Sequence, residues 1–136
     1  SNADPNALVV ATNAALAVER LGMPEARIVL AQAAAYVACA PKSNSAYCAI
    51  DAAMEVVANE KTATIPPYLM DAHYKGAAKL GHGIGYKYAH DFKNHYVKQQ
   101  YLPNEIKDRV FYVPSDHGYE KKIQEHLKKI REEAEE

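Results

Sequence analysis

The sequence predicts an all-α or mainly α fold, and three observations lead to this prediction. Residues 4–60 contain three segments of helical length with start and stop signals, and seventeen alanines lie between Ala7 and Ala58. Residues 61–115 are interrupted by glycines and prolines, which favour short helices and loops. Residues 116–136 carry apolar side chains at helical spacing. A chain of 136 residues has the size of one domain and can bury a core without disulfides or metals.

The first helix is predicted over about Pro5–Leu21. Asp4 can act as its N-cap, Pro5 takes the first helical position where a missing N–H is tolerated, and Gly22 ends it. Its polar stripe is narrow, so most of its circumference is apolar. Residues 1–3 look like the remnant of a cleaved expression tag. We therefore expect the natural segment to begin near Asp4 and to belong to a longer protein.

Two more alanine-rich helices are predicted at about Pro24–Ala40 and from a Ser43-Asn44 cap to about Asn59. Three helices with so much apolar circumference cannot fully cover one another. The surplus is covered either by the rest of the chain or by another subunit, and the pattern leaves both open. The residues that we expect in the core or in a subunit contact are Leu8, Val9, Leu16, Ile28, Leu30 and Tyr36.

The middle of the chain is predicted to hold short helices at Tyr68–His73 and Lys75–Leu80, followed by an irregular loop over Gly81–His95. Segments 96–102 and 110–113 leave room for one short hairpin around a helical turn.

The last predicted helix begins after a Ser115 or Asp116 cap. Its apolar stripe consists of Tyr119, Ile123, Leu127, Ile130 and Ala134. The run Glu132–Glu136 has little apolar content to hold it, so we expect it to fray.

Charge is distributed unevenly, although the net charge is only −1. Residues 61–101 carry six basic and two acidic side chains, together with six of the ten tyrosines and four of the six histidines. Lysines interleaved with tyrosines can attract phosphates and stack on bases, which makes nucleic-acid contact a candidate role. The lysines concerned are Lys75, Lys79, Lys87, Lys93 and Lys98. The pattern favours a simpler alternative, in which the tyrosines pack against the helices and the lysines are solvated.

Common catalytic motifs are absent from the sequence. The alternating glycines of 81–85 match neither the dinucleotide fingerprint nor a P-loop, and favour a tight loop with positive φ angles. The histidines lack zinc-site spacing, and no Gly-x-Ser-x-Gly occurs. We therefore predict no catalytic, cofactor-binding or metal-binding residue. Cys39 and Cys48 are expected to be buried free thiols, and the chain to be soluble and intracellular.

Several short blocks form an ordered series over nearly the whole chain. They are Gly22–Ala26, Ala40–Asn44, Asp71–Tyr74, Leu80–Gly83, Gly85–Tyr88, Gln99–Pro103 and Gly118–Glu120. In this order they resemble the C-terminal region of the RarA/MgsA family of replication-associated AAA+ ATPases, which are related to clamp loaders. The chain departs from the family pattern at Ala89, which replaces a proline.

The resemblance implies a clamp-loader-collar-like helical domain that joins subunits into a homotetramer. It places ATP, Mg²⁺ and the Walker motifs upstream, so no catalytic residue is carried over to this chain. It also implies a DNA-dependent ATPase that acts at stalled replication forks, with DNA and single-stranded DNA-binding protein as partners, in the cytoplasm near the nucleoid and away from membranes. We therefore expect a homo-oligomerisation domain, with a nucleic-acid-binding module over residues 68–101 as the alternative.

Overall fold

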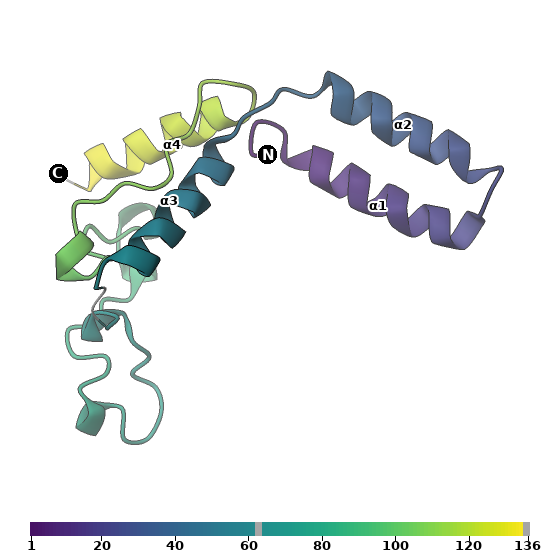
Figure 1. Cartoon of the computed structure of the whole chain (residues 1–136). Helices are drawn as coiled ribbons and strands as arrows, with labels where there is room; N and C mark the ends of the chain where they lie inside the picture. Colours follow the sequence, from purple (N-terminus) through teal and green to yellow (C-terminus); the bar gives the residue numbers. More distant parts are fainter. Residues whose placement is uncertain (62–63, 135–136) are drawn as a thin grey trace. The chain divides into compact units, whose positions relative to one another are not determined.

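The computed structural model describes residues 1–61 and 64–134, and in this part of the chain it is all-helical (Figure 1). The α-helices are α1 (Pro5–Leu21), α2 (Ala26–Cys39), α3 (Ser45–Asn59) and α4 (Glu120–Glu133). Short 3-10 turns follow α3, at Pro67–Leu69, Ala78–Leu80, Ala89–Asp91, Lys93–His95 and Asn104–Ile106. No strand occurs among the described residues, so the predicted fold class is confirmed. No helix in the described part is long and apolar enough to cross a membrane.

The chain divides into two compact units. Unit 1 comprises Ser1–Ile50 and Tyr112–Glu125, and unit 2 comprises Asp51–Phe111 and His126–Glu136. The expectation that residues 4–136 form a single domain stays a prediction.

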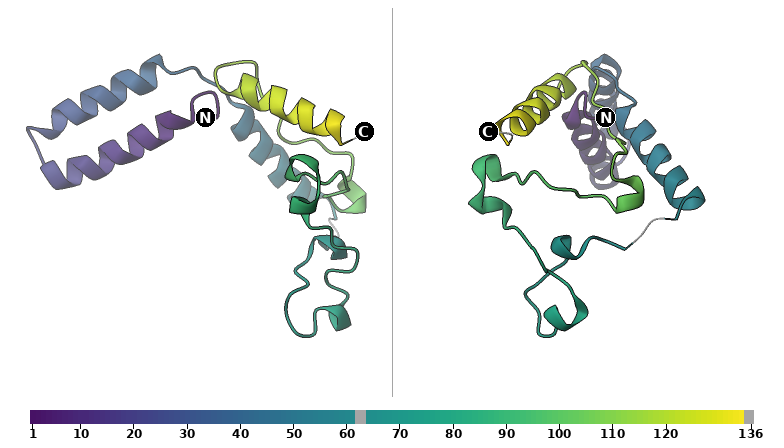
Figure 2. Two further views of the ribbon diagram at one scale, coloured as in Figure 1. Left: turned by 180° about the vertical axis from the view of Figure 1, so that it is seen from behind. Right: turned by 90° about the vertical axis from the view of Figure 1, so that its left-hand side faces the viewer.

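In unit 1, α1 and α2 lie side by side as an antiparallel hairpin, which both views of the ribbon show (Figures 1 and 2). Asp4 caps α1 by accepting the Asn6 N–H at 3.0 Å, and Gly22 ends the helix at a φ of 67°, as predicted. Helix α2 begins at Ala26, two residues later than predicted, because Pro24 and Glu25 belong to the turn between the helices.

The contact face of the hairpin is built from small side chains. Ala14 is the buried residue of α1, and Ala26 and Ala33 are the buried residues of α2. Alanines let two helix axes approach closely because no long side chain separates them. The hairpin therefore closes on its alanines.

A buried carboxylate organises the start of α4 in unit 1. Glu120 is 1 % exposed and accepts hydrogen bonds from the Ser115 N–H at 2.9 Å and the Tyr112 hydroxyl at 3.1 Å. Burial by itself would raise the pKa of Glu120, but hydrogen bonds from Ser43, Ser115, Tyr112 and Ser45 lower it below its usual value. Helix α4 begins at this carboxylate, four or five residues after the predicted caps.

In unit 2, the short hairpin allowed by the sequence does not form among the described residues. Three backbone carbonyls of segment 96–102 accept hydrogen bonds from side chains and not from a second strand. Tyr101 Oη donates to the Val97 carbonyl at 2.5 Å, Tyr68 Oη to the Gln100 carbonyl at 2.5 Å, and Gln100 Nε2 to the Leu102 carbonyl at 2.8 Å. These acceptors are therefore satisfied without a β-ladder. The two helices predicted at 68–73 and 75–80 shrink to 3-10 turns.

The glycine-rich segment forms the predicted tight loop. Gly81, Gly83 and Gly85 have φ angles of 74°, 74° and 79°. The Gly83 N–H donates to the Pro67 carbonyl at 2.8 Å, and a Cβ at Gly83 would lie 2.9 Å from the Ala72 Cα. Only glycine fits at that position.

Both cysteines are free, but the predicted burial is wrong because both are exposed. Cys39 lies at the end of α2 and Cys48 in the first turn of α3, on helix surfaces that the described part of the chain does not cover.

Candidate interaction surfaces

The α1–α2 hairpin carries a large apolar surface, which is hereafter called the hairpin surface. Its large apolar side chains are exposed, with Leu8 70 % exposed, Ile28 64 % and Tyr36 38 %. All six residues proposed for core or subunit contact are exposed, namely Leu8, Val9, Leu16, Ile28, Leu30 and Tyr36. The described chain thus uses none of them as core. Whether they form a subunit contact stays a prediction.

Helix α3 carries a second apolar stripe. Tyr47, Ile50, Met54 and Val57 are all exposed, at spacings of three, four and three residues. This is the a/d spacing of coiled-coil helices.

Three of the five predicted nucleic-acid lysines come together in unit 2. Lys87, Lys93 and Lys98 line a cavity of about 470 Å³, which is hereafter called the lysine cavity. Its other lining residues are Phe92, Tyr96, Val97, Glu133 and Ala134. Lys75 and Lys79 are exposed on the preceding segment and are not among its lining residues.

A tight turn shapes one wall of the lysine cavity. Asn94 and His95 have φ angles of 58° and 53°, in the left-handed region that side chains other than glycine rarely adopt. The Asn94 amide donates to Glu133 Oε2 at 2.5 Å, and Lys93 Nζ lies 3.8 Å from the same oxygen. The Asn94 hydrogen bond and the charges of Lys93 and Lys129 lower the pKa of Glu133.

Aromatic rings of residues 88–95 contact one another at tilted or edge-on angles. The centroids of Tyr88 and His90 are 5.1 Å apart, and those of His90 and His95 are 5.0 Å apart. The Nδ1 atoms of the two histidines are 3.2 Å apart, so one ring donates to the other. In the described part of the chain, no group of three or more histidine, cysteine, aspartate or glutamate side chains could hold a metal ion.

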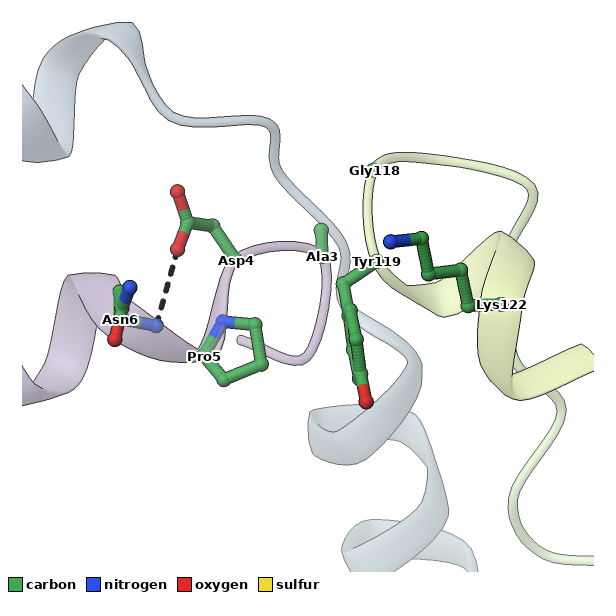
Figure 3. Close-up of a pocket in the computed structure, with 7 residues that line it drawn as sticks. All are labelled: Ala3, Asp4, Pro5, Asn6, Gly118, Tyr119 and Lys122. Carbon is green, nitrogen blue, oxygen red and sulfur yellow. Dashed lines mark hydrogen bonds between the residues drawn. The ribbon is translucent and has the colours of Figure 1, made fainter.

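A cavity of unit 1 lies where α1 begins (Figure 3). It has a volume of about 710 Å³ and is lined by Ala3, Asp4, Pro5, Asn6, Gly118, Tyr119 and Lys122. The ammonium group of Lys122 is 5.9 Å from the centroid of the Tyr119 ring. The Tyr119 N–H donates to the Ala3 carbonyl at 2.8 Å, and Ala3 is buried. The sequence interpretation missed this cavity because it set residues 1–3 aside.

Known proteins resemble this chain over almost its full length. The family model described as "MgsA AAA+ ATPase C terminal" matches residues 1–131. A Replication-associated recombination protein A from Bacillus subtilis is 45 % identical over 128 residues, which cover 94 % of this chain and 30 % of the relative. The Escherichia coli K12 protein of the same name is 40 % identical over 127 residues, 93 % of this chain and 28 % of the relative.

An uncharacterized AAA domain-containing protein from Mycobacterium tuberculosis is 45 % identical over 129 residues, 95 % of this chain and 28 % of the relative. This chain thus spans less than a third of the length of each of these relatives.

Proposed function

This chain belongs to the MgsA AAA+ ATPase C-terminal family, and from that premise we propose that it is a homo-oligomerisation domain with a tetramer as its expected state. The longer protein is proposed to be a DNA-dependent ATPase that binds ATP and Mg²⁺ upstream of this chain. The names of the Bacillus and Escherichia relatives support a role of that protein in replication-fork maintenance and recombination. DNA and single-stranded DNA-binding protein are its proposed partners.

The hairpin surface is the observation that carries this proposal. Its large apolar side chains are exposed in this chain, although transfer of apolar surface out of water is favourable. Helix α2 carries Arg27 as its sole charged side chain, and α1 carries only Glu19 and Arg20, which have opposite charges, so two copies of the surface meet little like-charge repulsion. A second copy of this chain is therefore the occupant that we propose.

Light scattering after size-exclusion chromatography tests the proposal. The chain is expected to elute with the mass of a tetramer, and Leu8→Glu combined with Ile28→Glu is expected to reduce it to a monomer. Ile84→Glu is the matched control, because Ile84 is similarly exposed but lies in unit 2. A wild-type chain that stays monomeric at high concentration contradicts the proposal.

Nucleic-acid binding is a second candidate, and the lysine cavity favours it. Lysines that converge on two aromatic walls offer phosphate neutralisation together with base stacking. The sequence pattern alone did not rank the five lysines. Because Lys87 lines the cavity and Lys79 does not, we expect Lys87 to contribute more to binding.

Fluorescence anisotropy of a labelled 20-mer of deoxythymidylate tests this candidate. If three lysines neutralise phosphates, the logarithm of the association constant should fall with the logarithm of salt at a slope of about −2. Lys87→Glu is expected to weaken binding more than Lys79→Glu. A flat salt response, or equal effects of the two reversals, contradicts a site at the lysine cavity.

A further inference from the structure

The lysine cavity contains a carboxylate among its lysines. Glu133 is the last residue of α4, its side chain is 26 % exposed, and it lines the cavity with Lys87, Lys93 and Lys98. One oxygen, Oε2, receives both the Asn94 hydrogen bond at 2.5 Å and the approach of Lys93 Nζ at 3.8 Å. An anion from the chain itself therefore already engages the Lys93 ammonium group of this cavity and the amide of the adjacent Asn94.

Those donors would serve a phosphate equally well. An amide N–H and an ammonium group bind a carboxylate oxygen and a phosphate oxygen by the same charge-assisted hydrogen bonds. The left-handed backbone of Asn94 and His95 holds this turn in an uncommon conformation, and the Asn94 amide meets Glu133 from that turn.

We propose that Glu133 is a built-in competitor at the lysine cavity, whose carboxylate occupies the position where Asn94 and Lys93 would hold a phosphate of single-stranded nucleic acid. This inference rests on the second candidate function above. A strand displaces the carboxylate when it binds, and its bases stack on Phe92 or Tyr96.

The competitor weakens binding without abolishing it. Glu133 stands at the end of its helix, so its side chain can turn away without unwinding α4. The ion pair with Lys93 is partly exposed and long, and such pairs contribute little to stability. The strand loses affinity mainly through the like charge that the carboxylate places beside its phosphates.

Glu133→Gln tests the competitor, because it keeps the size of the side chain and removes its charge. Glu132→Gln is the matched control, because it changes the net charge by the same amount one residue away. The Glu132 side chain is 65 % exposed, and its Oε1 lies 3.9 Å from Lys128 Nζ. The full chain is titrated with the labelled 20-mer of deoxythymidylate at low salt. Glu133→Gln is expected to tighten binding by about fivefold, and Glu132→Gln by less than about twofold.

The outcomes separate the two proposals. Equal tightening by both variants shows a net-charge effect and overturns the competitor while leaving nucleic-acid binding intact. Unchanged affinity in Glu133→Gln overturns it as well. Absence of binding by the wild type and both variants overturns the nucleic-acid candidate itself, and the competitor with it.

Discussion

The hydroxyl of Tyr36 on α2 donates a hydrogen bond to the carboxylate of Asp4, with 3.0 Å between Tyr36 Oη and Asp4 Oδ2. Asp4 thus caps α1 and also binds α2, at the end of the hairpin opposite the turn at Gly22. The hydrogen bond to Asp4 is the main cause that raises the pKa of Tyr36. One carboxylate therefore joins the free ends of the two helices.

Replacing Tyr36 with Phe removes this bond and is expected to lower the melting temperature by a few degrees. Because the folded-state pKa of Tyr36 is raised, its contribution is fully present below the ordinary pKa near 10 and is lost as pH rises through the raised value. Thermal unfolding followed by circular dichroism at pH 7 and above pH 10 checks both points. A Tyr36→Phe chain that keeps the wild-type loss of stability at high pH would contradict the assignment.

Glu120→Ala is expected to destabilise the chain by about 2–3 kcal/mol, because it leaves the Tyr112 hydroxyl and the Ser115 N–H without their buried acceptor. Urea unfolding at pH 7 measures this loss. Glu125→Ala, an exposed position on the same helix, is the control and should change the free energy of unfolding by less than about 0.5 kcal/mol.

The same carboxylate predicts a dependence on acid. The folded-state pKa of Glu120 is lowered below 4.5, so its stabilising contribution is present above pH 4.5 and is lost as pH falls through the lowered value. Glu120→Gln should flatten this part of the stability profile between pH 5 and pH 3, as followed by urea unfolding. If the variant loses as much stability between pH 5 and pH 3 as the wild type does, other carboxyl groups cause that loss.

Gly83→Ala is expected to disrupt the glycine-rich loop more than Gly81→Ala. Both glycines have a φ of 74°, so both substitutions carry the cost of a left-handed alanine, about 1 kcal/mol. A Cβ at Gly81 meets nothing within 4 Å, whereas one at Gly83 collides with Ala72. Limited proteolysis of the 67–86 segment should therefore accelerate most in Gly83→Ala, and equal rates would contradict the packing described.

Both thiols should react with a chromogenic disulfide reagent in native buffer, because Cys39 and Cys48 are exposed in the chain. The Leu8→Glu, Ile28→Glu variant, which we expect to be monomeric, is the cleanest sample, because a subunit contact would cover either cysteine. If fewer than two thiols react in that variant, at least one cysteine is buried, and the exposure described here is contradicted.

The sequence was sufficient to predict those parts of the fold that depend only on residues adjacent in the chain. Asp4, Pro5 and Gly22 predicted both ends of α1, because capping and termination need only the adjacent backbone. The alternating glycines predicted their own positive φ angles for the same reason.

Long-range hydrogen bonds account for what the sequence could not predict. The segment at 96–102 looks like a strand, but Tyr68, 32 residues before Gln100, satisfies one of its carbonyls. Fraying was expected over Glu132–Glu136, yet α4 continues to Glu133, which Asn94 holds from 39 residues away, while residues 135–136 lie outside the described part. The grouping of Lys87, Lys93 and Lys98 apart from Lys75 and Lys79 likewise needs three dimensions.

The alanine contact between α1 and α2 separates the residues that close the hairpin from those that give its surface its chemistry. Ala14, Ala26 and Ala33 are buried, whereas Leu8 and Ile28 are exposed. Substitutions at the exposed positions can therefore change the polarity of this surface without disturbing the buried contact that holds the two helices together.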